Sequence, residues 1–464
     1  MCKQAVGQQD QDETGGALEA TVIPRSAHSI SRTDISDNAL KVLYRLSKHG
    51  YQAYLVGGGV RDLLLGLKPK DFDIVTDASP EQVKKLFRNC RLVGRRFRLA
   101  HILFGRDIIE VATMRGHHSN AEDDKTGNAH AETGMILRDN VYGTIEEDAA
   151  RRDFSINALY YNIADFSVHD FAHGVEAIEK RKIDLIGDPE TRYREDPVRM
   201  LRAVRFAVKL DMSITKRTAK PIPELAHMLQ QIPAARLFEE VQKLFLAGRA
   251  LDTYKMLREY KLMQQLFPSL KPCFTDEGDS DAERFLEAAL ANTDKRIAEG
   301  KRVTPAFLFA ALYWGPVQAR CEELMLESDL PYTDALGLAS SDVLDRAQKR
   351  IAVPKRFSIP AREIWQLQLR LPKRMGNRAE KLAGHPRFRA AYDFLLLRGS
   401  IVGGEVEELA QWWTDYQQSD ESHQQQLIKA LKPRGPRRSR NSRRRRKPKS
   451  AGSSNKESKG ESNQ

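Results

Sequence analysis

The chain of 464 residues has little cysteine, and no two of its cysteines form a Cys-x-x-Cys pair. The four residues are Cys2, Cys90, Cys273 and Cys321, and they lie far apart. This spacing excludes a disulfide framework and a zinc finger, and it is typical of a reducing compartment. We expect all four to be buried or idle thiols.

Long apolar runs are also absent, so the sequence predicts no membrane-spanning helix. Residues 1–16 have neither the basic start nor the apolar stretch of a secretory signal peptide. We therefore expect a cytoplasmic protein.

Acidic residues are missing from residues 432–449, which hold 11 lysine and arginine residues. The whole chain has a formal net charge of +12, whereas the part before residue 432 has 62 basic and 61 acidic residues, a net charge of +1. The excess charge is thus concentrated in one tail, and such a tail suits a polyanion, most simply nucleic acid.

Strand and helix patterns alternate in the first part of the chain. Strands are predicted at residues 52–56, 71–75, 99–104, 108–113, 168–171 and 183–186, and helices at 60–65 and about 146–161. Ser79, Pro80 and Gln82 have the marks of a further helix start, with Ser79 as the N-cap. From Asp196 to Leu431 the pattern is almost wholly helical. The sequence therefore predicts an α+β part followed by an all-α part.

Gly57 and Gly58 lie between a predicted strand and a predicted helix. Such a turn places backbone N–H groups and the positive end of a helix beside an open space, which suits a phosphate. Arg61, in the first helical turn, can reach the same anion. Because glycine pairs are also common in plain turns, this signal is weak without companions.

Asp71 and Asp73 follow the glycine turn. In a strand, residues i and i+2 point to the same face, so the two carboxylates lie side by side and repel each other. A divalent cation removes that repulsion and can activate a hydroxyl that attacks a phosphate. Glu110, on an apolar predicted strand, and Asp153, on a predicted helix, are two candidates for a third carboxylate.

Asp196 and Pro197 form a good helix start. On the helix that follows, Arg199 and Arg202 are three residues apart and therefore adjacent. Their guanidinium groups, with Asp196 near the cap, can hydrogen-bond a base edge and a phosphate. An ordinary amphipathic helix with a charged outer face explains this composition equally well.

Four motifs occur in a fixed order: Gly57-Gly58-x-x-Arg61-Asp62, Asp71-x-Asp73, Arg151-Arg152-Asp153-Phe154-Ser155-Ile156-Asn157-Ala158-Leu159 and Glu195-Asp196-Pro197-x-Arg199-x-Leu201-Arg202. Together they resemble the class II nucleotidyltransferases, the family of bacterial poly(A) polymerases and tRNA CCA-adding enzymes. The resemblance covers about residues 40–250. It implies an α+β nucleotidyltransferase head with a mixed five-stranded sheet, then all-α neck, body and tail domains, with disordered termini.

The resemblance also implies a division of the chain. Its parts are a disordered N-terminal extension (1–32), the catalytic head (33–175), a neck that recognises the nucleotide base (176–250), a helical RNA-binding body (251–431) and a basic disordered tail (432–464).

The resemblance implies roles for the motif residues. Asp71 and Asp73 would bind the catalytic ions, Mg²⁺ or alternatively Mn²⁺, with Asp153 as a further catalytic acid and Glu110 as an alternative third ligand. The residues implied to bind the nucleotide, ATP, are Gly57, Gly58, Arg61, Arg152, Asp196, Arg199 and Arg202.

Within this family, the stretch from Leu185 to Pro197 looks like the poly(A) polymerase version, because CCA-adding enzymes usually have Phe in place of Tyr193. The basic tail points the same way. We therefore expect a monomeric enzyme that adds AMP to the 3′ ends of mRNA and other transcripts, with RNA-decay proteins as implied partners. The alternatives are a tRNA CCA-adding enzyme and a non-catalytic RNA-binding protein that acts through its tail.

Overall fold

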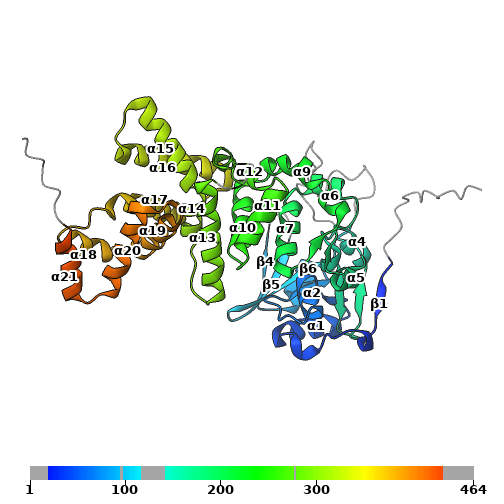
Figure 1. The fold of residues 1–464 in the computed structure, drawn as a ribbon. Helices are drawn as coiled ribbons and strands as arrows, with labels where there is room; N and C mark the ends of the chain where they lie inside the picture. The colour runs from blue at the N-terminus through cyan, green and yellow to red at the C-terminus, as the bar shows by residue number, and fades with distance from the viewer. Residues whose placement is uncertain (1–18, 95–97, 117–141, 276–277, 279, 432–464) are drawn as a thin grey trace, which may run out of the picture.

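The computed structural model describes residues 19–94, 98–116, 142–275, 278 and 280–431 (Figure 1). The predicted basic tail lies outside the described residues, as does Cys2. An α+β head forms one end of the molecule, and helices extend from it to the other end. The predicted order, an α+β part followed by an all-α part, is therefore confirmed.

The head is built on a mixed sheet of eight strands with the order β1-β8-β7-β2-β3-β6-β5-β4. In this sheet β3 and β6 are parallel, and all the other neighbours are antiparallel. The strands are β1 (Thr21–Ile23), β2 (Ala53–Val56), β3 (Asp73–Thr76), β4 (Cys90–Val93), β5 (Leu99–Phe104), β6 (Asp107–Thr113), β7 (Leu159–Asn162) and β8 (Val168–Asp170).

The mixed sheet is as expected, but it has eight strands where five were predicted. The strands of this sheet that the sequence did not predict are β1, β4 and β7. Strands β1 and β4 form the two edges, and all three are only three or four residues long. Strands this short carry little alternation of polar and apolar residues, so their pattern is weak.

Residues 19–32 belong to the head, although residues 1–32 were predicted to be disordered. Strand β1 pairs with β8, and Ile30 is buried in the core. The His28 ring also hydrogen-bonds the carbonyl oxygen of Phe166 at 2.9 Å. A few anchoring contacts thus order a segment whose composition is mostly polar.

The predicted helix over about 146–161 is shorter in the structure. Helix α4 (Ile145–Ala150) ends before the Arg-Arg-Asp motif, and Leu159–Asn162 forms β7. The apolar residues of this segment are buried on both faces of the sheet, so they show no strand alternation. Asp153 therefore lies in a turn rather than on a helix.

Strand β9 (Lys182–Ile183) overlaps the predicted 183–186 strand only at Ile183, and it does not join the head sheet. It pairs in parallel with β10 (Ser213–Ile214) in a separate two-stranded sheet. This small sheet connects the end of the head to the helices that follow.

Helices α1 (Asp37–Lys48), α2 (Gly58–Leu64), α3 (Pro80–Leu86) and α5 (Gly174–Glu179) complete the head. The predicted start of α3 is confirmed, because Ser79 and Gln82 form a capping box and Pro80 occupies the first turn. Helix α2 connects directly to the end of β2 and so positions the glycine turn.

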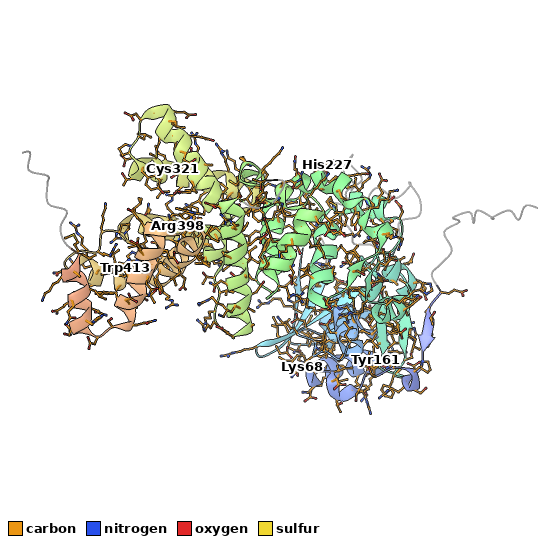
Figure 2. All side chains as sticks on the ribbon, in the orientation of Figure 1. Lys68, Tyr161, His227, Cys321, Arg398 and Trp413 are labelled. Atoms are coloured by element: carbon orange, nitrogen blue, oxygen red, sulfur yellow. The ribbon has the colours of Figure 1, made fainter. Side chains whose placement is uncertain are left out.

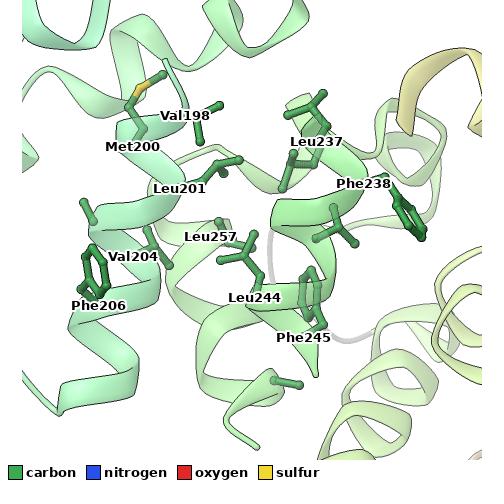
Figure 3. Close-up of a cluster of buried hydrophobic side chains, with 14 of the residues drawn as sticks. Val198, Met200, Leu201, Val204, Phe206, Leu237, Phe238, Leu244, Phe245 and Leu257 are labelled. Atoms are coloured by element: carbon green, nitrogen blue, oxygen red, sulfur yellow. The ribbon is translucent and has the colours of Figure 1, made fainter. Parts of the chain in front are cut away.

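The helices next to the head are α6 (Pro189–Glu195), α7 (Val198–Leu210), α8 (Lys216–Ala219), α9 (Ile222–Leu225), α10 (Ala234–Phe245) and α11 (Ala250–Glu259). Helices α6 to α10 fall within residues 176–250, the expected neck, and α11 begins where that segment ends. Figure 3 shows Leu201 and Val204 of α7 facing Leu244 of α10 and Leu257 of α11. One continuous hydrophobic core joins the head to these helices.

The remaining helices are α12 (Met263–Leu266), α13 (Asp281–Ala298), α14 (Pro305–Leu312), α15 (Trp314–Ser328), α16 (Tyr332–Ile351), α17 (Lys355–Arg370), α18 (Arg378–Ala383), α19 (Phe388–Val402), α20 (Gly404–Gln418) and α21 (Glu421–Ala430). Trp413 lies in the last group of helices (Figure 2), where its ring nitrogen donates to the carbonyl oxygen of Leu371 at 3.1 Å. Within the described residues, no helix is both long and apolar enough to span a membrane.

Candidate active site

Asp73 and Glu110 lie side by side on the head sheet. They are register partners in the parallel pair β3–β6, so their side chains point to the same face. Both side chains are exposed to solvent. Asp71 lies just before β3, because the strand begins at Asp73 and not at residue 71 as predicted. We call Asp71, Asp73 and Glu110 the acidic face.

The pKa of Asp73 is raised to about 6. The largest cause is desolvation, since the surrounding protein disfavours the charged form even though water reaches the carboxylate. Repulsion from Glu110 and from Asp71 raises the pKa further, whereas Arg152 lowers it. The acidic face therefore carries an excess of negative charge, which a cation would relieve.

Oxygen ligands of this kind suit a hard divalent cation. Among the described residues, however, no three His, Cys, Asp or Glu side chains are close enough to form a ready metal-binding group. Glu110 instead lies 3.3 Å from the ring nitrogen of His101 on β5. The acidic face therefore fits a cation by its charge and chemistry, although its carboxylates are not gathered into a ready ligand set among the described residues.

The glycine turn lies beside the acidic face. Gly57 has a φ of +70°, a backbone conformation that favours glycine. Its N–H donates to the carbonyl oxygen of Leu159 on β7, so this group is not available to a phosphate. A Cβ at Gly59 would lie 3.5 Å from the backbone oxygen of Asp71, which shows how closely the turn packs against the acidic face.

Arg152 extends over the glycine turn. A Cβ at Gly57 would lie 3.3 Å from the Arg152 Nη1 atom. The guanidinium donates to the Tyr160 hydroxyl at 2.7 Å and to the Asp148 carboxylate at 3.1 Å. Burial lowers the pKa of Arg152, but Tyr160 and Asp148 more than offset this, so the group stays charged. A fixed cation thus lies near both the glycine turn and Asp73.

Arg61 does not extend into open space, as its predicted phosphate contact requires. It is only 3% exposed, and it donates to Asn157 Oδ1 at 2.7 Å and to Asp62 Oδ1 at 2.6 Å. Its guanidinium also lies 5.2 Å from the centre of the Phe206 ring on α7. In this structure Arg61 connects the glycine turn to the Arg-Arg-Asp segment and to the neck.

Asp153 is mostly buried, with 12% of its side chain exposed, and it is bonded on both carboxylate oxygens. Oδ1 accepts from the Phe154 N–H at 2.9 Å and from Asn157 at 3.1 Å, and Oδ2 accepts from Arg202 Nε at 2.6 Å. Burial would raise the pKa of Asp153, but Arg202 and the hydrogen bonds lower it to about 2. Of the two candidates for a third carboxylate, Glu110 is therefore the one on the same face as Asp73.

The predicted base-recognition residues do not share one open surface. Arg202 pairs with Asp153, whereas Arg199 is 9% exposed and donates to Glu195 at 2.8 Å. Asp196 accepts from Arg236 of α10 at 2.7 Å. The structure thus brings Arg202 to the head but holds Asp196 and Arg199 through partners within the neck.

Arg192 is a residue that sequence reasoning missed as part of this site. Its Nη2 atom donates to the carbonyl oxygens of Arg151 and Arg152, at 2.8 and 2.7 Å. Burial and the neighbouring Arg199 lower the pKa of Arg192 to about 10. The sequence did offer a signal for Arg192, because this residue lies within the Leu185–Pro197 stretch. That stretch was used only to distinguish poly(A) polymerases from CCA-adding enzymes.

Phe206 of α7 is packed against the arginines at the boundary of head and neck. The guanidinium groups of Arg61, Arg202 and Arg205 lie 5.2, 5.2 and 4.9 Å from the centre of its ring. Phe154 packs edge-on against the same ring at 5.6 Å. We call Arg61, Asp153, Asn157, Arg202 and Phe206 the head–neck joint.

Three family profiles match the chain. They are the Poly A polymerase head domain (residues 53–184), the probable RNA and SrmB-binding site of polymerase A (211–274), and the polymerase A arginine-rich C-terminus (328–448).

Relatives that match most of the chain carry the name of the same kind of enzyme as the family profiles. The chain is 58% identical to Poly(A) polymerase I of Salmonella typhimurium over 412 residues, or 89% of each protein, and 52% identical to that of Haemophilus influenzae over 89% of this chain and 91% of the relative. A CCA-adding enzyme of Bacillus pumilus is 36% identical, but over only 49% of this chain and 54% of that protein.

The CCA-adding enzyme of Bacillus stearothermophilus, solved with CTP, has a similar fold. Its TM-score is 0.51 at 26% identity, and the match covers 81% of this chain and 80% of that enzyme. The Thermotoga maritima CCA-adding enzyme has a TM-score of 0.57 at 19% identity, with 86% of each chain covered. The chain therefore belongs to the poly(A) polymerase family of nucleotidyltransferases.

Proposed function

We propose that this enzyme adds AMP from ATP to RNA 3′ ends without a template, at the acidic face. The observation that carries the proposal is the register pairing of Asp73 with Glu110 beside a glycine turn covered by Arg152. Carboxylates and a fixed arginine on one surface suit a triphosphate and its counterions.

Asp71, Asp73 and Glu110 are the residues that would hold divalent ions, and we assign them Mg²⁺, with Mn²⁺ as the alternative. When bound, such ions lower the pKa of an attacking hydroxyl and neutralise a leaving pyrophosphate. The carboxylates must be ionised for this role, so the raised pKa of Asp73 limits the site at low pH.

Arg152 and the first turn of α2 would bind the triphosphate of ATP. Gly57 and Gly58 carry no side chains, so phosphate oxygens can approach the backbone there. The N–H groups at the start of a helix lack partners within the helix and point towards such an anion. In-line attack of the RNA 3′ hydroxyl on the α-phosphorus then releases pyrophosphate.

Arg199, Arg202 and Asp196 would select the base. Since Arg202 is fixed by Asp153, and the backbone of Arg152 is fixed by Arg192, the neck is held in register with the phosphate site. We propose that Asp153 acts by this positioning, as does Arg61. Asp196 and Arg199 would have to exchange their present partners for the base.

We assign the catalytic head to residues 19–175, which extends the predicted 33–175 to include β1. The neck covers residues 176–250 and the RNA-binding body residues 251–431. The basic segment 432–464 would bind RNA phosphates without regard to sequence, with a strong dependence on salt. We further propose that the enzyme is a cytoplasmic monomer, that it associates with RNA-decay proteins and that it promotes RNA turnover.

The deciding experiment supplies ATP, CTP, GTP and UTP separately to the enzyme with one generic RNA. Incorporation of AMP alone, abolished by Asp71→Ala or Asp73→Ala, is expected. Ordered addition of C, C and A to a truncated tRNA, with refusal of generic RNA, would establish the CCA-adding alternative. Undiminished AMP incorporation by both aspartate variants would refute the catalytic assignment.

A further inference from the structure

A cavity of about 340 Å³ lies in the helical body, outside the site described above. It is formed by α13, α14, α17 and α19, which Figure 1 shows between the neck and the last helices of the chain. The cavity has the size of a small-molecule site. The wall residues between 292 and 308 lie outside the three segments that match family profiles, whereas those between 356 and 393 lie within the last of these segments.

The wall of the cavity is apolar and partly aromatic. Phe307, Phe357, Val303 and Ile364 contribute to it. Both phenylalanines are only partly buried. The Phe357 ring stacks on Phe238 at 6.0 Å and the Phe307 ring packs edge-on against Phe394 at 6.1 Å, so each ring offers only its remaining surface to a ligand. Flat aromatic surfaces of this kind suit a nucleobase, because every base has a face that can stack.

Five arginines line the same cavity, against one acidic residue, Asp393. Arg389 bonds Asp393 at 3.0 Å, Arg296 lies 3.8 Å from it, and Arg387 bonds Glu363 at 3.0 Å. These three arginines are therefore at least partly compensated by neighbouring acids.

The other two arginines, Arg302 and Arg356, are exposed. Within the part of the chain that the structure describes, neither guanidinium has a hydrogen bond or an ion pair to a protein group. Arg356 only packs against its neighbour Phe357, 4.9 Å from the ring centre. Two uncompensated guanidinium groups at the mouth of an aromatic cavity favour a ligand that carries phosphate.

We propose that this cavity binds a nucleotide of the RNA strand, upstream of the 3′ end that occupies the head. The base enters between the apolar walls, and Arg302 and Arg356 bind the flanking phosphates. The inference rests on the proposed function for the identity of the polyanion. An acidic peptide would satisfy the arginines but would leave the aromatic wall without a matching group.

The test is RNA binding by the double variant Arg302→Glu/Arg356→Glu. The control is Lys41→Glu/Lys48→Glu, which makes the same change in net charge at two exposed lysines of α1 that have no ion-pair partner among the described residues. Fluorescence anisotropy is measured with oligoadenylates of about 16 and about 4 nucleotides, the range of single-strand site sizes.

For the long RNA we expect binding weakened on the order of tenfold, and a slope of log affinity against log salt reduced by about 1.4, the value for two lost phosphate contacts on a single strand. The short RNA should bind and accept AMP as it does with the unchanged enzyme. Arg302→Lys/Arg356→Lys should restore the salt slope, because the charges return.

Equal affinity and salt slope in the test and control variants would overturn the proposal. So would an equal loss for short and long RNA, which would locate the effect in the head. Free AMP that binds the unchanged enzyme but not the glutamate variant would make the cavity a mononucleotide site instead. Failure of the proposed function itself is distinguishable, since it would remove AMP transfer in every variant and leave these binding results intact.

Discussion

Asp73 and Asp153 belong to neighbouring parts of the same enzyme, yet their environments act on them in opposite directions. On the acidic face, desolvation and two further carboxylates raise the pKa of Asp73 to about 6. In the head–neck joint, Arg202 and hydrogen bonds from Asn157 and Phe154 outweigh burial and lower the pKa of Asp153 to about 2. The charge of Asp73 is only partly compensated, by Arg152, whereas Asp153 is fully partnered.

This difference separates two roles that a sequence motif does not distinguish. An uncompensated charge on an exposed face is ready for a ligand, whereas a buried and paired charge holds elements together. By this criterion we infer that Asp73 takes part in the chemistry. We infer that Arg61, Asp153 and Arg202 position the neck against the head.

The largest effect is expected for Asp73→Asn. Removing a metal ligand should lower kcat for AMP transfer by more than about 100-fold, the upper range for loss of an outer partner of a metal site. Thermal unfolding should show equal or higher stability, because a repulsive charge has been removed from the acidic face. A clear loss of stability would show instead that the charge of Asp73 stabilises the fold, as that of Asp153 does.

A large loss of stability is expected for Asp153→Asn. The variant leaves Arg202 without its anion, at a cost of about 3 kcal/mol, the lower end for a broken buried pair because Arg202 is partly exposed. Urea unfolding measures this value. The double variant Asp153→Asn/Arg202→Met should recover part of the loss, and simple additivity of the two changes would argue against their coupling.

A smaller effect is expected for Arg192→Lys. Lysine cannot bond the carbonyl oxygens of Arg151 and Arg152 together as the guanidinium does, so we expect a loss of about 1–3 kcal/mol and a higher KM for ATP. Arg194→Lys is the matched control, because Arg194 lies on the same helix but is exposed and, among the described residues, bonds Glu190 alone. Equal effects of the two substitutions on stability and on KM would show that Arg192 does not position the Arg151–Arg152 backbone.

The two aspartates should also differ in their pH dependence. Asp73 has a folded-state pKa above its ordinary 3.8, so it takes up a proton as the pH falls through about 6. At limiting metal concentration, AMP transfer should then fall about tenfold for each pH unit below 6, and saturating metal should shift this fall to lower pH.

Asp153 has a folded-state pKa below 3.8, so its contribution to stability is present above pH 3.8 and is lost as the pH falls towards 2. Acid unfolding of Asp153→Asn should therefore depend less on pH in that range than unfolding of the unchanged enzyme. Identical acid-unfolding profiles would contradict the assigned environment of Asp153.

Much of this molecule was predictable from sequence, since its signals are local. The order of the motifs identified the family, and the capping residues of α3 located its start. The extent of α4 was not predictable, because the segment after it is buried on both faces and loses the strand pattern. Short edge strands such as β1 depend on pairing with distant strands.

The partners of individual charges also depend on distant parts of the chain. Arg61 meets Asn157, 96 residues away, and Arg202 meets Asp153, 49 residues away. No spacing rule connects such pairs, so the sequence could not separate ligand-binding arginines from those that fix the neck. For Glu110 the sequence offered a candidate ligand but could not show that it lies beside Asp73. That position follows only from the pairing of β3 with β6.

The head–neck joint has a consequence for repeated catalysis. Separating α7 from the head would break the ion pair between Asp153 and Arg202. It would also expose the hydrophobic core that the two regions share. A hinge at this position is therefore costly to open in every cycle. We therefore expect the head and α7 to stay together after each addition. The RNA would then move by one nucleotide relative to the residues that bind it.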